Sequence, residues 1–193
     1  MQLLRGSSDS ELKQSDLSRD PSNYNYTNQG STETLSERSD YKTTSAAFKA
    51  FGFSAEEINT TWRTVAAILH LGNVQFALQD DEIVIANRNV LKSVAKLLNV
   101  TENEASTALT QRVIAAHGDI MKKQHDKTQA EFGRDAFAKA IYERLFTWIV
   151  ERINKAIEVP NKSLAKRFNR VIGVVDIYGF EIFDDNQFEQ VIF

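Results

Sequence analysis

The pattern of apolar and polar positions separates a polar first quarter of the chain from a mainly helical remainder. Residues 1–45 are rich in Ser, Thr, Asn and Asp and contain only scattered Leu and Tyr. This composition is typical of a connecting loop or of a surface that lies on a partner. From Ser45 onward, apolar residues recur at helical spacing. The clearest stripe consists of Ile58, Trp62, Val65 and Leu69.

Two capping boxes predict where helices begin. In such a box a Ser or Thr side chain accepts a bond from the backbone three residues later, and a Glu there reaches back. Residues 54–57 are predicted to open a helix that ends at Gly72, and residues 101–104 to open a later one. Residues 90–98 have the spacing of an amphipathic helix between them, and a long helix is predicted over residues 129–157. We interpret its apolar stripe as core: Phe137, Ile141, Leu145, Trp148 and Ile149.

Strand signals are few. Residues 74–78 and 83–85 flank the acidic turn 79–82 and predict a short β-hairpin. Residues 112–127 break the helical rhythm and are expected to form a loop. The continuous apolar run at residues 171–175 predicts a strand that is covered on both faces. The sequence therefore predicts a mainly α fold with a small β-hairpin and one central buried strand.

Composition narrows the classes of function. The net charge of -3, from 23 Lys and Arg against 26 Asp and Glu, is too balanced to attract nucleic acid, so no nucleic-acid partner is expected. Without cysteine the chain has no disulfide and no Cys-ligated metal. His70, His117 and His125 do not lie at ligand spacing. The apolar stretches are too short to cross a bilayer, and no membrane contact is expected from this segment.

Candidate chemistry lies where the predicted strand 171–175 ends. Asp176 follows that strand, and Gly179 comes three residues later. In nucleotide-hydrolysing α/β proteins a carboxylate at this end of a strand holds the Mg²⁺ shell, and a glycine lets the backbone approach a phosphate closely. Taken alone, this spacing favours a plainer alternative, a strand that ends in an Asp-capped turn.

The longer string VIGVVDIYGFEIFDDNQFEQ, residues 171–190, resembles the switch II strand, loop and relay-helix start of the myosin motor domain. QLLRGSSDSEL, RDPSNYNYTNQG, WRTVAAILHLGNVQF and GRDAFAKAIYERLFTWIVERIN are similar to further parts of class I myosin motors. Together they cover roughly residues 2–193. The resemblance implies the upper actin-binding cleft region of a P-loop NTPase-type motor, and not a complete domain.

The resemblance also implies roles for individual residues. Asp176 would hold Mg²⁺ through water, and the Gly179 amide would donate to the γ-phosphate of ATP. Glu181 would pair with an Arg of switch I and align the attacking water. Ile177, Phe180 and Phe183 would couple this loop to the relay helix. ATP and Mg²⁺ are thus the cofactors expected in an intact motor, which would act as an actin-activated Mg-ATPase.

A second candidate site is the loop 112–127. In myosins the matching loop touches actin, and the residue sixteen positions before the Asp of the Arg-Asp-Ala motif is acidic or phosphorylatable. Counting back from Asp135 gives Asp119, with Lys122 and Lys123 close behind it. A fixed carboxylate would supply permanently the charge that a phosphate supplies elsewhere. The alternative is an ordinary turn with one solvated charge.

By resemblance the chain divides into a polar connecting region after the switch I helix (1–45), a helical upper-cleft region (46–170) and the switch II segment (171–193). The sequence contains neither a P-loop pattern nor the switch I strand, so the chain alone is expected not to hydrolyse ATP. The expected partners are the actin filament, the remainder of the motor domain and calmodulin-type light chains on a lever that the chain lacks. The expected location is the cytoplasmic actin cytoskeleton. The alternative function is a non-catalytic actin-binding or scaffolding fragment.

Overall fold

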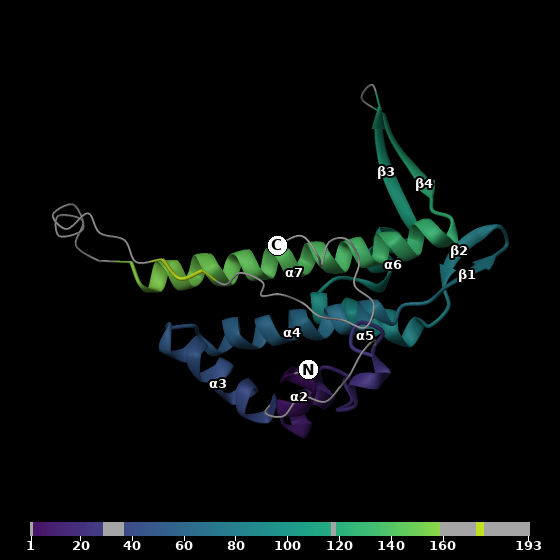
Figure 1. Cartoon of the computed structure of the whole chain (residues 1–193). Helices are drawn as coiled ribbons and strands as arrows, with labels where there is room; N and C mark the ends of the chain where they lie inside the picture. The colour runs from purple at the N-terminus through teal and green to yellow at the C-terminus, as the bar shows by residue number, and fades with distance from the viewer. Residues whose placement is uncertain (1, 29–36, 117–118, 159–172, 176–193) are drawn as a thin grey trace, which may run out of the picture. The chain divides into compact units, whose positions relative to one another are not determined.

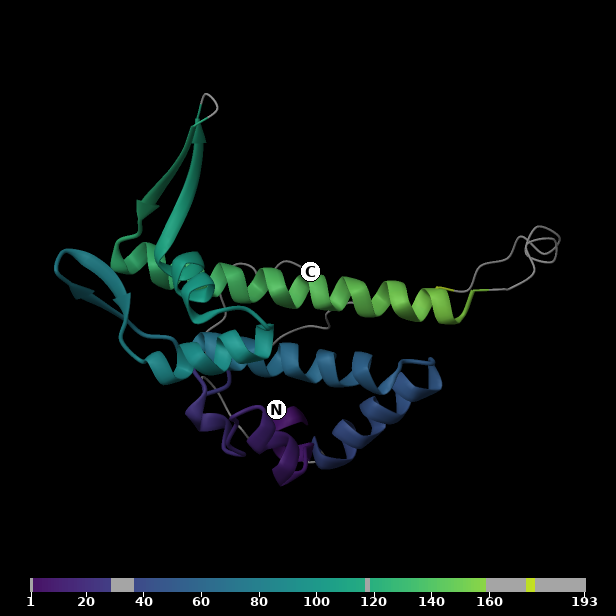
Figure 2. The same cartoon turned by 180° about the vertical axis from the view of Figure 1, so that it is seen from behind.

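Two long helices run side by side through the structure. The computed structural model describes residues 2–28, 37–116, 119–158 and 173–175. The chain divides into two units, Met1–Ile157 and Glu158–Phe193, and all the described helices and strands lie in the first. There α4 (Ala55–Gly72) lies along α7 (Lys127–Ala156), as Figures 1 and 2 show.

Side chains at the start of α4 fix it against α7. At the start of α4, the predicted capping box forms between Ser54 and Glu57. Glu57 also accepts a bond from Arg152 of α7 at 3.0 Å, and the same guanidinium donates to the Gly52 carbonyl at 2.6 Å. Gly52 has a φ of +72°, a conformation that glycine adopts without strain. The Glu57 carboxylate, which the sequence predicts as part of the capping box, therefore also binds α7.

The N-terminal region is helical, which corrects the expectation of a connecting loop. It forms α1 (Gln2–Gly6), α2 (Asp9–Gln14), a 3₁₀ turn (Pro21–Asn23) and α3 (Glu37–Ala50). Its scattered apolar residues are buried together with residues of α4; they are Leu3, Leu4, Leu12, Leu17, Tyr24 and Tyr41. The alternative interpretation of this composition was a surface that lies on a partner. It agrees with the structure, since these residues pack against α4 of the same chain.

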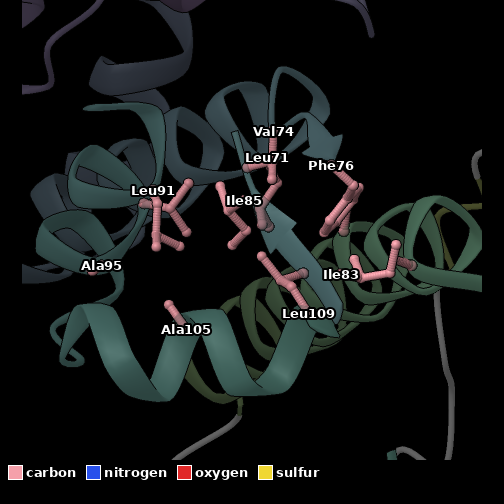
Figure 3. Packing of buried hydrophobic residues seen from close by; sticks show 12 residues of the cluster. Leu71, Val74, Phe76, Ile83, Ile85, Leu91, Ala95, Ala105 and Leu109 are labelled. Carbon is pink, nitrogen blue, oxygen red and sulfur yellow. The ribbon is translucent and has the colours of Figure 1, made fainter. Parts of the chain in front are cut away.

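A second core forms around the predicted hairpin. β1 (Phe76–Gln79) and β2 (Glu82–Ile85) pair antiparallel, and α5 (Arg88–Leu98) and α6 (Glu102–Thr110) follow. Figure 3 shows the apolar side chains of these elements pointing toward one another. The buried members include Leu71, Val74, Phe76, Ile83, Ile85, Leu91, Val94 and Leu109. The hairpin, both helices and the Thr101 capping box are confirmed.

The segment predicted as the loop 112–127 is mostly a second hairpin. β3 (Gln111–Ala116) pairs antiparallel with β4 (Asp119–Gln124), with Ala116 opposite Asp119. The β-branched residues Val113, Ile114 and Ile120 favour strands on both sides of Gly118. In Figures 1 and 2 this hairpin projects away from the helices.

Two expectations about apolar segments differ from the structure. Residues 173–175 of the predicted buried strand have no regular secondary structure, and residues 171–172 lie outside the described part. A strand needs a neighbour to bond to, and both described sheets have only two strands, paired with each other. The α7 stripe is only partly core: Phe137 is 39% exposed, and Ala130 and Ala138 are the residues of α7 described as buried. Within the described residues, no helix combines the length and apolarity that a bilayer span requires.

Candidate functional site

The two candidate sites differ in how far the structure describes them. Asp176, Gly179 and Glu181 lie outside the described residues, as do Ile177, Phe180 and Phe183, so their roles stay predictions. The other site, residues 112–127, falls on the hairpin β3–β4 and the start of α7. In the described ranges, no group of three or more His, Asp or Glu side chains is arranged to hold a metal ion.

Positive charge gathers on the β3–β4 hairpin. Arg112 lies directly opposite Lys123 in the antiparallel register, and both side chains are exposed. Lys122 precedes Lys123 in β4, and Asp119 begins that strand; both are placed by their backbones alone. Met121 between them is 63% exposed. Like charges opposite each other weaken a strand pair, so this arrangement costs the hairpin some stability.

The base of the hairpin is joined to the helices on both sides. β3 follows α6 without an intervening residue, and the His125 amide donates to the Thr110 carbonyl at 2.9 Å, which closes the base. Asp126 then caps α7 by accepting from the Gln129 amide at 2.8 Å. The hairpin therefore extends from two helix ends that are themselves fixed, while its strands contact mainly each other.

A polar cluster beside this base holds the start of α7 in place. Tyr26 and Arg134 both donate to the same oxygen of Asp135, Arg134 at 2.8 Å. Arg134 also donates to the Val74 carbonyl at 2.9 Å, just before β1. The ring of Tyr26 packs on Gly72, where a Cβ would lie only 2.8 Å from the ring. Gly72 is thus required by its close packing against Tyr26.

The electrostatics of this cluster favour the charged pair. Burial raises the pKa of Asp135, but the bonds from Arg134 and Tyr26 outweigh burial and leave that pKa below its ordinary value. For Arg134, burial is the largest single influence and lowers the pKa, but Asp135 and Tyr26 together outweigh burial and raise that pKa above its ordinary value. Burial and the neighbouring carboxylate together raise the pKa of the Tyr26 phenol. The cluster therefore stays as a carboxylate, a guanidinium and a neutral phenol across the physiological range.

Sequence reasoning missed three parts of this site. The sequence has a hairpin signal in Gly118 between two β-branched segments, which was interpreted as a loop. Asp126 followed by Gln129 is an N-cap pattern that could have fixed the start of α7 two residues earlier. The contact of Tyr26 with Asp135 joins residues 109 positions apart, and no local pattern predicts it.

Comparison with known proteins adds an independent line of evidence. The family described as "Myosin head (motor domain)" matches residues 1–193. "Unconventional myosin ID" of Drosophila melanogaster is 61% identical over 189 residues, which is 98% of this chain and 19% of the fly protein. "Unconventional myosin-Id" of Homo sapiens is 46% identical over 192 residues, with the same coverage. "Unconventional myosin-Ig" of Homo sapiens is 38% identical over 205 residues, which is 98% of this chain and 20% of the human protein.

These matches agree with the class I-like resemblance and with the predominantly helical fold. The chain spans about a fifth of the length of these curated relatives. A family match over all 193 residues, together with 61% identity to an unconventional myosin, establishes that the chain belongs to the myosin head (motor domain) family.

Proposed function

We propose that this chain is the part of an actin-based, ATP-driven motor that presents the β3–β4 hairpin to the actin filament and carries switch II. The observation that carries the filament contact is the exposed pair Arg112 and Lys123 on a hairpin that projects from the helices. Among the described residues neither side chain has a carboxylate partner. Two unpaired cations placed side by side weaken the hairpin but attract an acidic surface.

The hairpin carries a charge of opposite sign to the chain as a whole. Residues Gln111–Gln124 contain three basic residues, Arg112, Lys122 and Lys123, and one acidic residue, Asp119. The net charge of the whole chain, by contrast, is -3. The basic charge is therefore local, and it would act on one face of a partner at short range. This supports a specific docking contact with an acidic surface and not a general affinity for polyanions.

In the intact motor, the switch II residues would perform the nucleotide chemistry. Asp176 would hold the Mg²⁺ shell, the Gly179 amide would contact the γ-phosphate, and Glu181 would pair with the Arg of switch I. ATP and Mg²⁺ are the proposed cofactors. The proposed partners are actin, the remainder of the motor and light chains of the calmodulin type, and the proposed location is the actin cytoskeleton.

The isolated chain is proposed to be inactive toward ATP. Its sequence has no Gly-x-x-x-x-Gly-Lys pattern, so no backbone loop of that kind cradles the β- and γ-phosphates. Actin-stimulated phosphate release from the purified chain, above a heat-killed control, would contradict this. A non-catalytic scaffolding role is not favoured, because the family match extends over the whole chain.

Co-sedimentation of the purified chain with filamentous actin at low salt tests the filament contact. Replacing both Arg112 and Lys123 by Gln should weaken binding by about five- to tenfold, because each exposed charge contributes at most about 1 kcal/mol. The matched control replaces Lys92 of α5 and Lys155 of α7, which are also exposed cations, and should bind like the parent. Equal binding by both double variants would contradict the proposed contact.

A further inference from the structure

A cavity of about 700 Å³ lies among α2, α3, α4 and α5, away from the β3–β4 hairpin. Its volume falls within the range of small-molecule sites in proteins. Leu3, Ile58 and Leu97 form part of an apolar wall. Tyr41 and Trp62 line it as well, with ring centroids 4.7 Å apart and planes tilted by 40°. This wall offers flat aromatic surface to a ligand with an apolar body.

Four cationic side chains line the cavity against one carboxylate, and that carboxylate already accepts several hydrogen bonds. Lys42, Lys49, Arg63 and Lys96 line the cavity together with Glu11. Glu11 accepts bonds from the Ser8 amide and hydroxyl, each at 2.7 Å, and from the Tyr41 hydroxyl at 3.0 Å. Those bonds lower the pKa of Glu11 despite the opposing effect of burial, which is the largest single influence on it. Glu11 is therefore ionised and already accepts three hydrogen bonds.

Two of the four cations have no described partner. Arg63 donates to the carbonyls of Lys96 and Leu97 at the end of α5, and Lys96 pairs with Asp16 at 3.1 Å. Within the described ranges, neither Lys42 nor Lys49 forms an ion pair. They lie seven residues apart on α3, close to two helical turns, and so project from one face of that helix.

We propose that this cavity is a binding site for an amphipathic organic anion. An aromatic body would lie against Tyr41 and Trp62, and an acidic group would face Lys42 and Lys49. The ammonium groups of Lys42 and Lys49 can only donate, so a group that binds both of them must supply the acceptors. Because the cavity and the hairpin share no residues, the site is independent of the proposed filament contact.

Fluorescence titration of the full chain tests this with two probes of nearly the same shape. The anionic probe is 8-anilinonaphthalene-1-sulfonate, and the neutral probe is N-phenyl-1-naphthylamine, which has the same rings without the sulfonate. In a Trp148→Phe background, Trp62 is the remaining tryptophan, and energy transfer from it reports probe bound near Trp62, which the variants below then locate. We expect the anionic probe to bind more tightly at low salt than at high salt, and the neutral probe to show little salt dependence.

Charge and volume variants then locate the site. Replacing Lys42 and Lys49 by Gln should raise the Kd of the anionic probe several-fold and leave that of the neutral probe unchanged. Replacing Lys92 and Lys155 by Gln is the control and should change neither. Ala46→Trp, which fills the cavity, should weaken both probes. Both lysines and Ala46 are exposed, so these variants are expected to fold, and far-ultraviolet circular dichroism verifies it.

Three results would overturn the proposal. One is an absence of energy transfer from Trp62 with either probe. Another is an unchanged Kd for the anionic probe in the Lys42 and Lys49 variant, which would place that probe on another surface, such as exposed Phe132 and Phe146 of α7. The third is equal weakening in the control pair, which would show only a dependence on net charge.

Discussion

The two β-hairpins of this chain have the same pairing geometry and opposite environments. In β1–β2 the side chains of Phe76, Ile83 and Ile85 are 5%, 5% and 7% exposed and form part of the core. In β3–β4 the described side chains of Arg112, Met121 and Lys123 are exposed. The first hairpin is held by burial, and the described contacts of the second are mainly between its own strands.

The tips of the hairpins differ as well. Asp80 and Asp81 connect β1 to β2 with φ values of 50° and 63°, the left-handed pair that a tight hairpin turn requires and that Asp tolerates. This tip is acidic, whereas the strands of β3–β4 are basic. Substitutions in a hairpin with a buried face disturb the core. A hairpin whose described side chains are exposed can instead serve as a contact surface.

The largest expected difference between the hairpins is in stability. Phe76→Ala should lower the free energy of unfolding by about 3–5 kcal/mol, because it removes a buried ring and leaves a cavity. Met121→Ala should change it by less than about 0.5 kcal/mol, since that side chain is exposed. Urea denaturation of both variants beside the parent chain measures this. A loss above 2 kcal/mol for Met121→Ala would show that Met121 is buried against another part of the protein and would contradict the contrast between the hairpins.

A smaller effect is expected where α7 is bonded to the segment before β1. Arg134 bonds both Asp135 and the carbonyl of Val74, just before β1. Arg134→Leu should cost about 1–3 kcal/mol, because it leaves the Asp135 carboxylate and the Val74 carbonyl without this donor. Arg144→Leu, at an exposed position of the same helix, is the control and should be nearly silent. If both variants unfold at the same urea concentration, the link contributes nothing to stability.

The sequence predicted the elements whose signals are local and missed those whose partners are distant. The capping boxes at Ser54 and Thr101 and the β1–β2 hairpin follow from adjacent residues, and they are confirmed. Residues 1–45 have too few apolar positions to show a helical period, and their helices are stabilised by burial against α4. A hydrogen bond between residues 48 positions apart, such as the one that the Asn25 amide donates to the Asn73 side chain, cannot be predicted from the spacing of residues along the chain.

For the candidate site, too, the sequence predicted some features and missed others. The position of the segment proposed to face actin came from the Arg-Asp-Ala resemblance, and the structure has a projecting hairpin there. Its strand character was missed, because two short strands with charged residues lack the alternation of a half-buried strand. The roles of Asp176, Gly179 and Glu181 depend on motif resemblance alone and stay predictions.

A pH-dependent effect is expected where α4 packs against the N-terminal region. His70, in the last turn of α4, is buried and bonds the Ser15 carbonyl through Nε2 at 2.9 Å. Burial lowers the pKa of His70 from its ordinary value of 6.5, against the opposing effects of the Ser15 carbonyl and of Asp16. As the pH falls through 6.5, the unfolded chain therefore takes up a proton that the folded chain does not. Stability should fall over that window, by at most about 1.4 kcal/mol per pH unit for this one group.

Urea denaturation at pH 7.5, 6.5 and 5.5 measures this slope. His70→Gln retains an N–H that can donate to the Ser15 carbonyl and does not titrate, so its stability should vary less over this range than that of the parent. An identical pH slope in parent and variant would contradict the assignment. A change of similar size is not expected from the carboxylates with lowered pKa values, such as Glu57, because their contribution is lost only at more acidic pH.

The smallest expected effect concerns Asp119 at the start of β4, in an intact motor that carries this segment. Asp119→Ala should lower actin-activated ATPase several-fold and leave basal ATPase nearly unchanged, because the hairpin is proposed to contact the filament and not the nucleotide. An exposed charge contributes typically below about 1 kcal/mol, and the effect should shrink as salt rises. Asp119→Glu keeps the charge and should be nearly silent. Asp119→Ser should behave like the Ala variant until a kinase phosphorylates it, and then recover. Wild-type actin activation in the Ala and unphosphorylated Ser variants at low salt would show that Asp119 is an ordinary turn residue, and the functional contrast between the hairpins would then depend on Arg112 and Lys123 alone.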